Sequence, residues 1–178
     1  MTYRMLYREK QYSGLVFDVA KVYLQLPNGR ERAYDLVEHG DSVTIVPVDA
    51  NGKVYFVTQH RVGSGGLLLE LPAGVLEKGE DPLVSAAREI REEIGMGAES
   101  LRELGGFYLA PGYTDEYMTV FLATGLYPSP LDPDEDEFLN LVTMSVDEVY
   151  QIALAGEIQD GKSLAALLLA MPFIRTSV

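Results

Sequence analysis

The sequence of 178 residues contains no cysteine. That absence excludes disulfide bonds and thiolate metal sites, and it is compatible with a reducing compartment. Lysine and arginine are also few, 14 against 27 aspartate and glutamate residues, which gives a net charge of −13. A chain this acidic argues against binding to a nucleic-acid backbone or to an anionic membrane surface.

Long hydrophobic runs are missing as well. The longest apolar stretch, residues 164–174, is far shorter than the ~20 residues that span a bilayer. The first ten residues lack the apolar segment of a signal peptide, so we expect a cytoplasmic protein. With 47% hydrophobic residues, the chain can form one well-packed core but is too short for two ordinary domains.

Residues 74–96 contain the most informative pattern in the chain. Asp81 suits the N-cap of a helix, Pro82 its first position and Gly95 a left-handed stop at its end. The apolar residues of this helix recur at helical spacing and predict its buried face: Leu83, Ala86, Ala87, Ile90 and Ile94.

Three carboxylates lie beside that face. Glu89 and Glu93 are one turn apart, and Glu92 lies on the adjoining flank. They repel one another unless a cation lies among them, and a hard divalent cation, Mg²⁺ or Mn²⁺, is the natural partner of oxygen ligands. Residues 71–74 are expected to turn from a strand into a loop, which would bring backbone carbonyls close to the carboxylates.

The spacing of these residues resembles the Nudix box of the Nudix hydrolase family. Gly74 is followed after five residues by Glu80, and after seven more by Arg88-Glu89. The remaining specified positions of the box are also filled, by Ile90, Glu92, Glu93, Gly95 and Met96. A solvated acidic helix is the alternative interpretation, and the complete match disfavours it.

The resemblance implies the Nudix fold, an α+β arrangement in which a mixed β-sheet lies between α-helices. Its implied metal ligands are the Ala73 carbonyl and the carboxylates of Glu89, Glu92 and Glu93. The implied catalytic residues include Arg88, which would orient the carboxylates, and Glu92. Glu80 would brace Arg88 from the loop.

Residues 110–116 are similar to the ADP-ribose pyrophosphatase group of this family. Pro111 falls 15 residues after Met96 and begins a Pro-Gly-x-Thr-Asp-Glu segment. The resemblance implies that Gly112 and Glu116 approach the substrate, or in the case of Glu116 a metal. The common form has serine where this chain has Ala110, and a plain turn is the alternative interpretation.

An acidic run, residues 132–137, is expected to form a loop after the strand predicted over 118–126. In the ADP-ribose enzymes the corresponding loop supplies a glutamate that acts as base or metal ligand. Glu137, just before a strand expected over 138–144, is the implied catalytic residue, with Glu135 as the alternative. Family members often have a further glutamate where Asn140 stands, so local substrate contacts are expected to differ.

Residues 12–39 predict a long β-hairpin around a turn at 27–29. The ADP-ribose enzymes carry a similar N-terminal extension that often exchanges across a homodimer and helps to hold the adenine. We therefore divide a single Nudix domain, 1–178, into an extension, 1–40, and a core, 41–178. The hairpin aromatics either stack on the base or pack within the sheet.

Arg61 ends a strand that is expected to run near the metal loop. Its guanidinium suits bidentate binding of a phosphate, and Gln59-His60-Arg61 is similar to a Gln-x-Arg setting in the ADP-ribose enzymes. A surface ion pair is the alternative. Residues 63–66 are expected to be a flexible connector. Further strands are predicted over 43–48, 54–57, 67–71 and 101–109, and further helices over 146–155 and 163–171.

Taken with composition, the resemblance implies Mg²⁺-dependent hydrolysis of the pyrophosphate bond of a nucleoside diphosphate derivative, first of all ADP-ribose to AMP and ribose 5-phosphate. The implied partners are a small nucleotide and a second copy of the chain, with no nucleic acid and no membrane. The alternatives are another nucleotide sugar, a dinucleoside polyphosphate or a (d)NTP as substrate, or a module that senses ADP-ribose without cleaving it.

Overall fold

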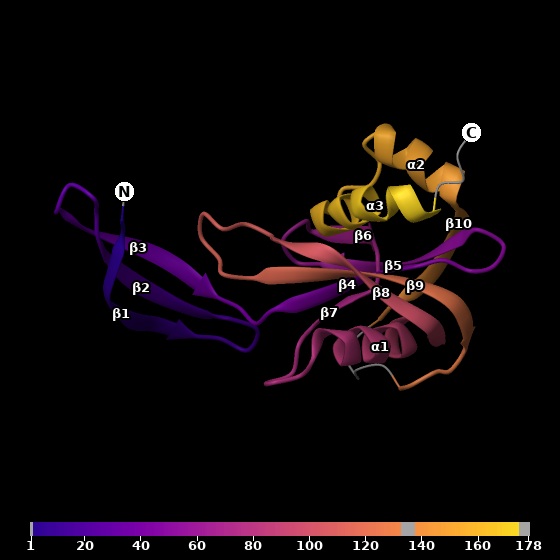
Figure 1. Cartoon of the computed structure of the whole chain (residues 1–178), viewed down its shortest axis with the longest axis horizontal. Helices are drawn as coiled ribbons and strands as arrows, with labels where there is room; N and C mark the ends of the chain where they lie inside the picture. Colours follow the sequence, from indigo (N-terminus) through magenta and orange to yellow (C-terminus); the bar gives the residue numbers. More distant parts are fainter. Residues whose placement is uncertain (1, 133–137, 175–178) are drawn as a thin grey trace. The chain divides into compact units, whose positions relative to one another are not determined.

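The computed structural model describes residues 2–132 and 138–174 (Figure 1). The strands are β1 (Arg4–Ser13), β2 (Asp18–Gln25), β3 (Glu31–Glu38), β4 (Ser42–Pro47), β5 (Lys53–Arg61), β6 (Gly66–Glu70), β7 (Ala73–Val75), β8 (Met96–Tyr108), β9 (Tyr117–Pro128) and β10 (Asn140–Ser145). The helices are α1 (Pro82–Glu93), α2 (Val146–Leu154) and α3 (Gly161–Ile174).

The chain forms two compact units. The first comprises Met1–Asp41 and Phe107–Met118, and the second Ser42–Gly106 and Thr119–Val178. Strands β8 and β9 each contribute residues to both units. Each unit is therefore described by itself.

The first unit contains an antiparallel sheet in the order β1-β2-β3. The hairpin expected from the sequence is confirmed for β2 and β3, but a third strand, β1, was not predicted. Its residues are mostly exposed, so no alternation of apolar and polar side chains marks it. The strand expected from residue 12 onward is broken at Gly14, whose N–H donates to the Phe17 carbonyl in a turn.

The second unit contains two sheets, in the orders β10-β5-β6 and β7-β4-β9-β8. Helices α1 and α3 both contact β4, and Figure 1 shows them on opposite sides of it. The predicted α+β class, a mixed sheet between helices, is confirmed. One core cluster joins α1 to the strands and includes Val43, Ile45, Val57, Ala86, Ile90, Ile94, Phe121 and Ala123.

Helix α1 begins and ends close to the predicted residues. The Asp81 carboxylate accepts a hydrogen bond from the Leu83 N–H at 2.8 Å, and Gly95 has a φ of +70° just after the helix. Leu83 itself is 46% exposed, so its place in the predicted buried face was wrong. Ser85 and Glu89 are buried instead: the Ser85 hydroxyl accepts a hydrogen bond from Arg88, and the Glu89 carboxylate lies against the backbone of Gly74 on β7.

Other elements follow the prediction with shifted ends. Strand β5 continues to Arg61, and residues 62–65 form a hydrogen-bonded turn into β6 rather than a loose connector, with Gly65 at a φ of +69°. Ser145 caps α2 with Glu148 in a reciprocal capping box. Within residues 2–132 and 138–174, the helices are too short or too polar to cross a membrane.

Candidate active site

Arg88 is the centre of a cluster of carboxylates on α1 and the loop before it. Its Nη1 donates to Glu89 at 2.7 Å and to Glu92 at 2.9 Å. Its Nε and Nη2 donate to both oxygens of Glu80, at 3.2 and 3.1 Å. The side chain is only 26% exposed. One guanidinium therefore fixes three carboxylates at the positions that the box pattern specifies.

The charges of this cluster stabilise one another. The hydrogen bond from Arg88 holds the pKa of the Glu80 carboxyl below its usual range. The same hydrogen bond, with the negative charge of Glu89, raises the pKa of Arg88. Both groups are ionised at neutral pH, so Arg88 acts as a fixed cation that aligns the acidic side chains.

Gly74 is required by the position of Glu89. A Cβ atom at residue 74 would lie 1.9 Å from Oε1 of Glu89 and 2.1 Å from its Cδ. No side chain fits that space while the carboxylate stays where it is. The first residue of the box is a glycine because α1 brings a buried carboxylate, 8% exposed, directly over the backbone of β7.

Glu93 faces the same segment of backbone. Its Oε2 accepts a hydrogen bond from the Ala73 N–H at 3.2 Å. The Ala73 N–H and the Glu93 carboxylate are therefore neighbours, and the metal-ligand roles expected for Ala73, Glu89 and Glu93 stay predictions.

The chemistry of these donors fits a hard divalent cation. All of them are oxygens, and four carboxylates share the region with the single guanidinium of Arg88. Among residues 2–132 and 138–174, however, no three acidic or histidine side chains converge as a ligand set. In this structure one oxygen each of Glu89 and Glu92 accepts a hydrogen bond from Arg88.

Arg61 is engaged in an ion pair, but with a buried carboxylate rather than with the surface partner of the alternative interpretation. Its Nε and Nη2 donate to the two oxygens of Glu70, at 2.8 and 2.7 Å. Glu70 is 2% exposed, and Lys162 also donates to it. A role for Arg61 in phosphate binding stays a prediction, and it would use N–H groups of the guanidinium other than the two that bind Glu70.

Residues 110–116 form a hydrogen-bonded turn in the first unit. The N–H groups of Tyr113 and Thr114 both donate to the Ala110 carbonyl at 3.0 Å, and Gly112 is exposed. The Glu116 carboxylate lies 3.8 Å from Nδ1 of His39. The turn that was the alternative interpretation is thus present, and the substrate roles of Gly112 and Glu116 stay predictions.

The catalytic glutamates expected in the acidic loop, Glu137 and its alternative Glu135, lie outside the described residues. The chain leading to that loop is attached to α1. Arg91 donates through Nε to the carbonyl and the hydroxyl of Ser129, at 3.0 and 3.1 Å, and its own carbonyl accepts from the Leu131 N–H at 3.0 Å. An unspecified position of the box therefore anchors the start of the loop.

Comparison with known proteins agrees with this geometry. The model of the NUDIX domain matches residues 38–167, which include the whole cluster around Arg88. The chain belongs to the NUDIX family. Its resemblance to this family, first seen in the spacing of the box, is confirmed.

Two relatives and one solved structure illustrate the range of Nudix proteins that are similar to it. The ADP-ribose pyrophosphatase of Bacillus subtilis (strain 168) is 35% identical over 90% of this chain and 88% of its own. The methanol dehydrogenase activator of Bacillus methanolicus is 35% identical over 89% and 87%. A crystal structure of an ADP compounds hydrolase has a TM-score of 0.87 and 26% identity, covering 98% of this chain and 95% of that one.

The ion cluster around Glu70 was missed by the sequence analysis of this Nudix chain. Glu70 binds Arg61 and Lys162, and Lys162 also donates to Asp160 at 2.9 Å. A signal was present, because Glu70 is a single charge within the apolar run 67–71, and a buried charge requires partners. The sequence does not reveal those partners, since Lys162 lies 92 positions away.

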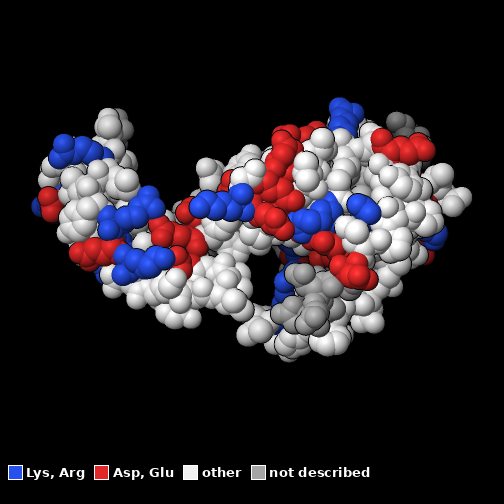
Figure 2. Space-filling view, turned by 90° about the horizontal axis from the view of Figure 1, so that it is seen from below, with Lys and Arg blue, Asp and Glu red and all other residues white. Residues whose placement is uncertain are grey.

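The β1–β3 sheet carries many paired charges and stacked rings. Arg8 pairs with Glu38 at 2.5 Å, and acidic and basic side chains lie side by side on the face shown in Figure 2. The ring of Tyr23 stacks on the ring of Tyr7, with 4.3 Å between the ring centroids. For Tyr23 the structure thus contains the packing within the sheet that was one of the two interpretations.

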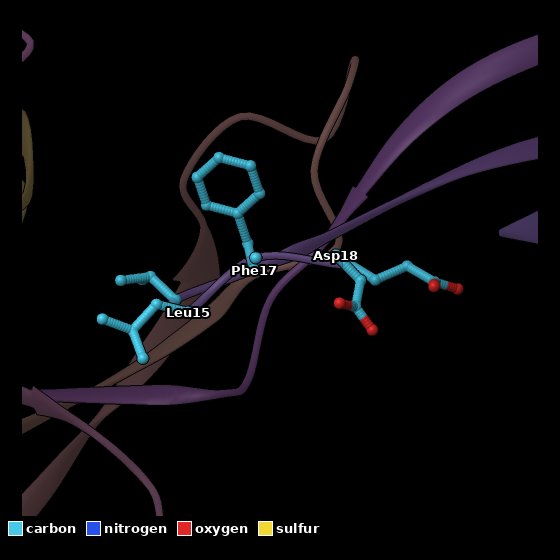
Figure 3. A pocket seen from close by; sticks show the side chains of 6 residues that line it. Leu15, Phe17 and Asp18 are labelled. Carbon is cyan, nitrogen blue, oxygen red and sulfur yellow. The ribbon is translucent and has the colours of Figure 1, made fainter. Parts of the chain in front are cut away.

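A shallow hollow lies at the turn between β1 and β2. It is lined by residues 14–18 and Glu38, and Figure 3 shows the Leu15, Phe17 and Asp18 side chains pointing in different directions from this turn. Leu15 is fully exposed and Phe17 is 42% exposed. These apolar groups are available to a further molecule.

Proposed function

We propose that this Nudix protein hydrolyses the pyrophosphate bond of a nucleoside diphosphate derivative, with ADP-ribose as the preferred substrate and AMP and ribose 5-phosphate as products. The observation that carries the proposal is the complete box geometry, in which Arg88 holds Glu80, Glu89 and Glu92 while Glu93 faces the Ala73 backbone. The names of similar proteins, ADP-ribose pyrophosphatase and ADP compounds hydrolase, support this substrate class.

Family membership favours a divalent metal, and we infer that it is Mg²⁺, with Mn²⁺ able to replace it. Glu89, Glu93 and the Ala73 carbonyl would hold the ion, with Glu92 as an additional ligand. When bound, the ion neutralises the diphosphate and makes an attacking water more acidic.

The chain's own residues orient the metal-binding carboxylates and provide the general base. Arg88 orients Glu89 and Glu92, and Glu80 restrains Arg88 through two hydrogen bonds. Hydrolysis adds water across the P–O–P bridge, and the proton lost by the attacking water would pass to Glu137, or to Glu135 as the alternative. Of the residues proposed to contact substrate, Gly112 is exposed and available.

The first test is hydrolysis of ADP-ribose in the presence of Mg²⁺, followed by phosphatase-coupled release of phosphate, beside GDP-mannose, a diadenosine polyphosphate and dGTP. A strong preference for ADP-ribose is expected. Turnover of a different compound only would keep the chemistry of the box and reject the substrate. Binding of ADP-ribose without any turnover would support the alternative, a sensing module.

A second test removes one carboxylate charge of the box. Glu93→Gln keeps the shape of the side chain, so the variant should fold normally while turnover falls by about 100-fold or more, because a metal ligand is weakened. Glu103→Gln, an exposed residue of β8, is the matched control and should leave turnover unchanged. Near-normal kcat in folded Glu93→Gln would refute the metal role.

A further inference from the structure

We propose that Ser163, in the first turn of α3, is a positioning residue for the metal-binding segment, residues 71–73, which directly precedes the Nudix box and includes the Ala73 carbonyl proposed as a metal ligand. The inference rests on the proposed function, because it concerns the backbone that would supply one metal ligand. Ser163 lies far from the box in the sequence and is fully buried. Its hydroxyl group contacts the backbone just before the box.

Three consecutive residues of the segment are each tied to a different element. The Leu71 N–H donates to Oγ of Ser163 on α3 at 2.7 Å. The Pro72 carbonyl accepts from the Ile45 N–H on β4 at 2.9 Å, and the Ala73 N–H donates to Glu93 on α1 at 3.2 Å. The segment's position is therefore set by α3, β4 and α1 together.

The direction of the Ser163 hydrogen bonds is fixed by its neighbour. The Ser163 hydroxyl donates its single proton to Oδ2 of Asp160 at 2.5 Å, because an ionised carboxylate can only accept. A lone pair of Oγ is left for the Leu71 N–H. Asp160 is itself held by the Ser163 N–H at 3.1 Å and by Lys162.

Ion pairs hold the residues on both sides of the Ser163–Leu71 hydrogen bond. Glu70, the residue before Leu71, binds Arg61 and Lys162, and Lys162 bridges to Asp160. Two cations and two carboxylates thus hold the end of β6 against the start of α3. Within this frame the Ser163–Leu71 hydrogen bond sets where the chain turns toward Ala73, two residues later.

Removing the hydroxyl leaves the Leu71 N–H without this acceptor, at a position where the residue is 1% exposed and water is excluded. The backbone then shifts to find another acceptor, and the shift is passed to the Ala73 carbonyl. The expected result is weaker metal binding rather than a general loss of structure.

The test is a Mn²⁺ titration of the full chain, followed through the electron paramagnetic resonance signal of free Mn²⁺. Ser163→Ala should weaken Mn²⁺ binding about tenfold or more, as changes behind metal ligands do. The matched control is Tyr150→Phe. Tyr150 lies on α2 and donates a hydrogen bond of 2.7 Å to the Leu167 carbonyl on α3, the helix that also carries Ser163, so the substitution removes a buried hydrogen bond to α3 without touching the segment. Its Mn²⁺ affinity should match that of the wild type.

Equal affinities of Ser163→Ala and wild type would overturn the inference, as would equal weakening in Ser163→Ala and Tyr150→Phe. If Ser163→Ala does not fold, Asp160→Ala replaces it: it removes the acceptor that orients the Ser163 hydroxyl and should also weaken binding, and unchanged affinity there overturns the inference. Glu93→Gln separates the two proposals. If wild type binds Mn²⁺ no better than Glu93→Gln, the proposed metal site fails as well.

Discussion

Gly74 has no side chain, and the carboxylate of Glu89 occupies the space that a side chain would need. Gly74→Ala is therefore expected to displace the carboxylate. The clash involves the flexible end of Glu89, so the fold should be retained, but a misplaced metal ligand should reduce kcat about 100-fold. Steady-state kinetics measure the loss of kcat, and thermal unfolding shows whether the fold is retained.

Gly63→Ala is the control for this substitution. A Cβ atom at residue 63 meets nothing within 4 Å, and the residue lies in the turn after β5. Its kcat should equal that of the wild type. A Gly74→Ala protein with full kcat would contradict the assignment of Glu89 as a ligand.

At the scale of elements, the ion cluster around Glu70 joins β5, β6 and the segment that begins α3. Burial raises the pKa of Glu70, but the hydrogen bond from Arg61 and the charge of Lys162 outweigh it, so the pKa is lowered in the folded chain. A lowered pKa means that the carboxylate stabilises the fold fully above its ordinary value of 4.5. This contribution is lost as the pH falls through the lowered pKa.

Glu70→Gln should therefore reduce the free energy of unfolding at neutral pH by roughly 3 kcal/mol, since it removes a buried carboxylate that pairs with the largely buried Lys162 and the half-exposed Arg61. The difference from wild type should shrink as the pH falls below 4.5. Urea unfolding at a series of pH values measures it. Glu103→Gln, at an exposed position, should show little difference at any pH, and a constant difference for Glu70→Gln would contradict the ion-pair account.

At the scale of the whole molecule, the expected homodimer stays a prediction. The first unit exposes large apolar side chains at its β1–β2 turn, with Leu15 fully exposed and Val16 65% exposed. Sedimentation equilibrium of the full chain should give twice its mass of 19.6 kDa. Leu15→Asp should weaken the dimer, whereas Leu154→Asp on α2, where the side chain is 85% exposed, should not. A monomeric wild type would contradict the prediction.

The sequence predicted the elements whose signals are local. Asp81 and Gly95 mark the ends of α1 because capping depends on one or two neighbouring residues. Strand β1 was missed because its residues are mostly exposed, so its side chains do not alternate between a buried and an exposed face. Leu83 was misplaced because helical spacing predicts a stripe but does not say which partners cover it.

The sequence by itself determined the acidic helix, through its caps and periodicity, and the family, through the spacing of the box; the α+β class followed from the resemblance to that family. Only the tertiary structure decided that Arg61 pairs with Glu70, that Glu89 lies against Gly74, and that Ser163 holds Leu71. These contacts join residues from separate elements. Which residues become partners depends on how the elements pack in three dimensions, and no fixed spacing in the sequence predicts it.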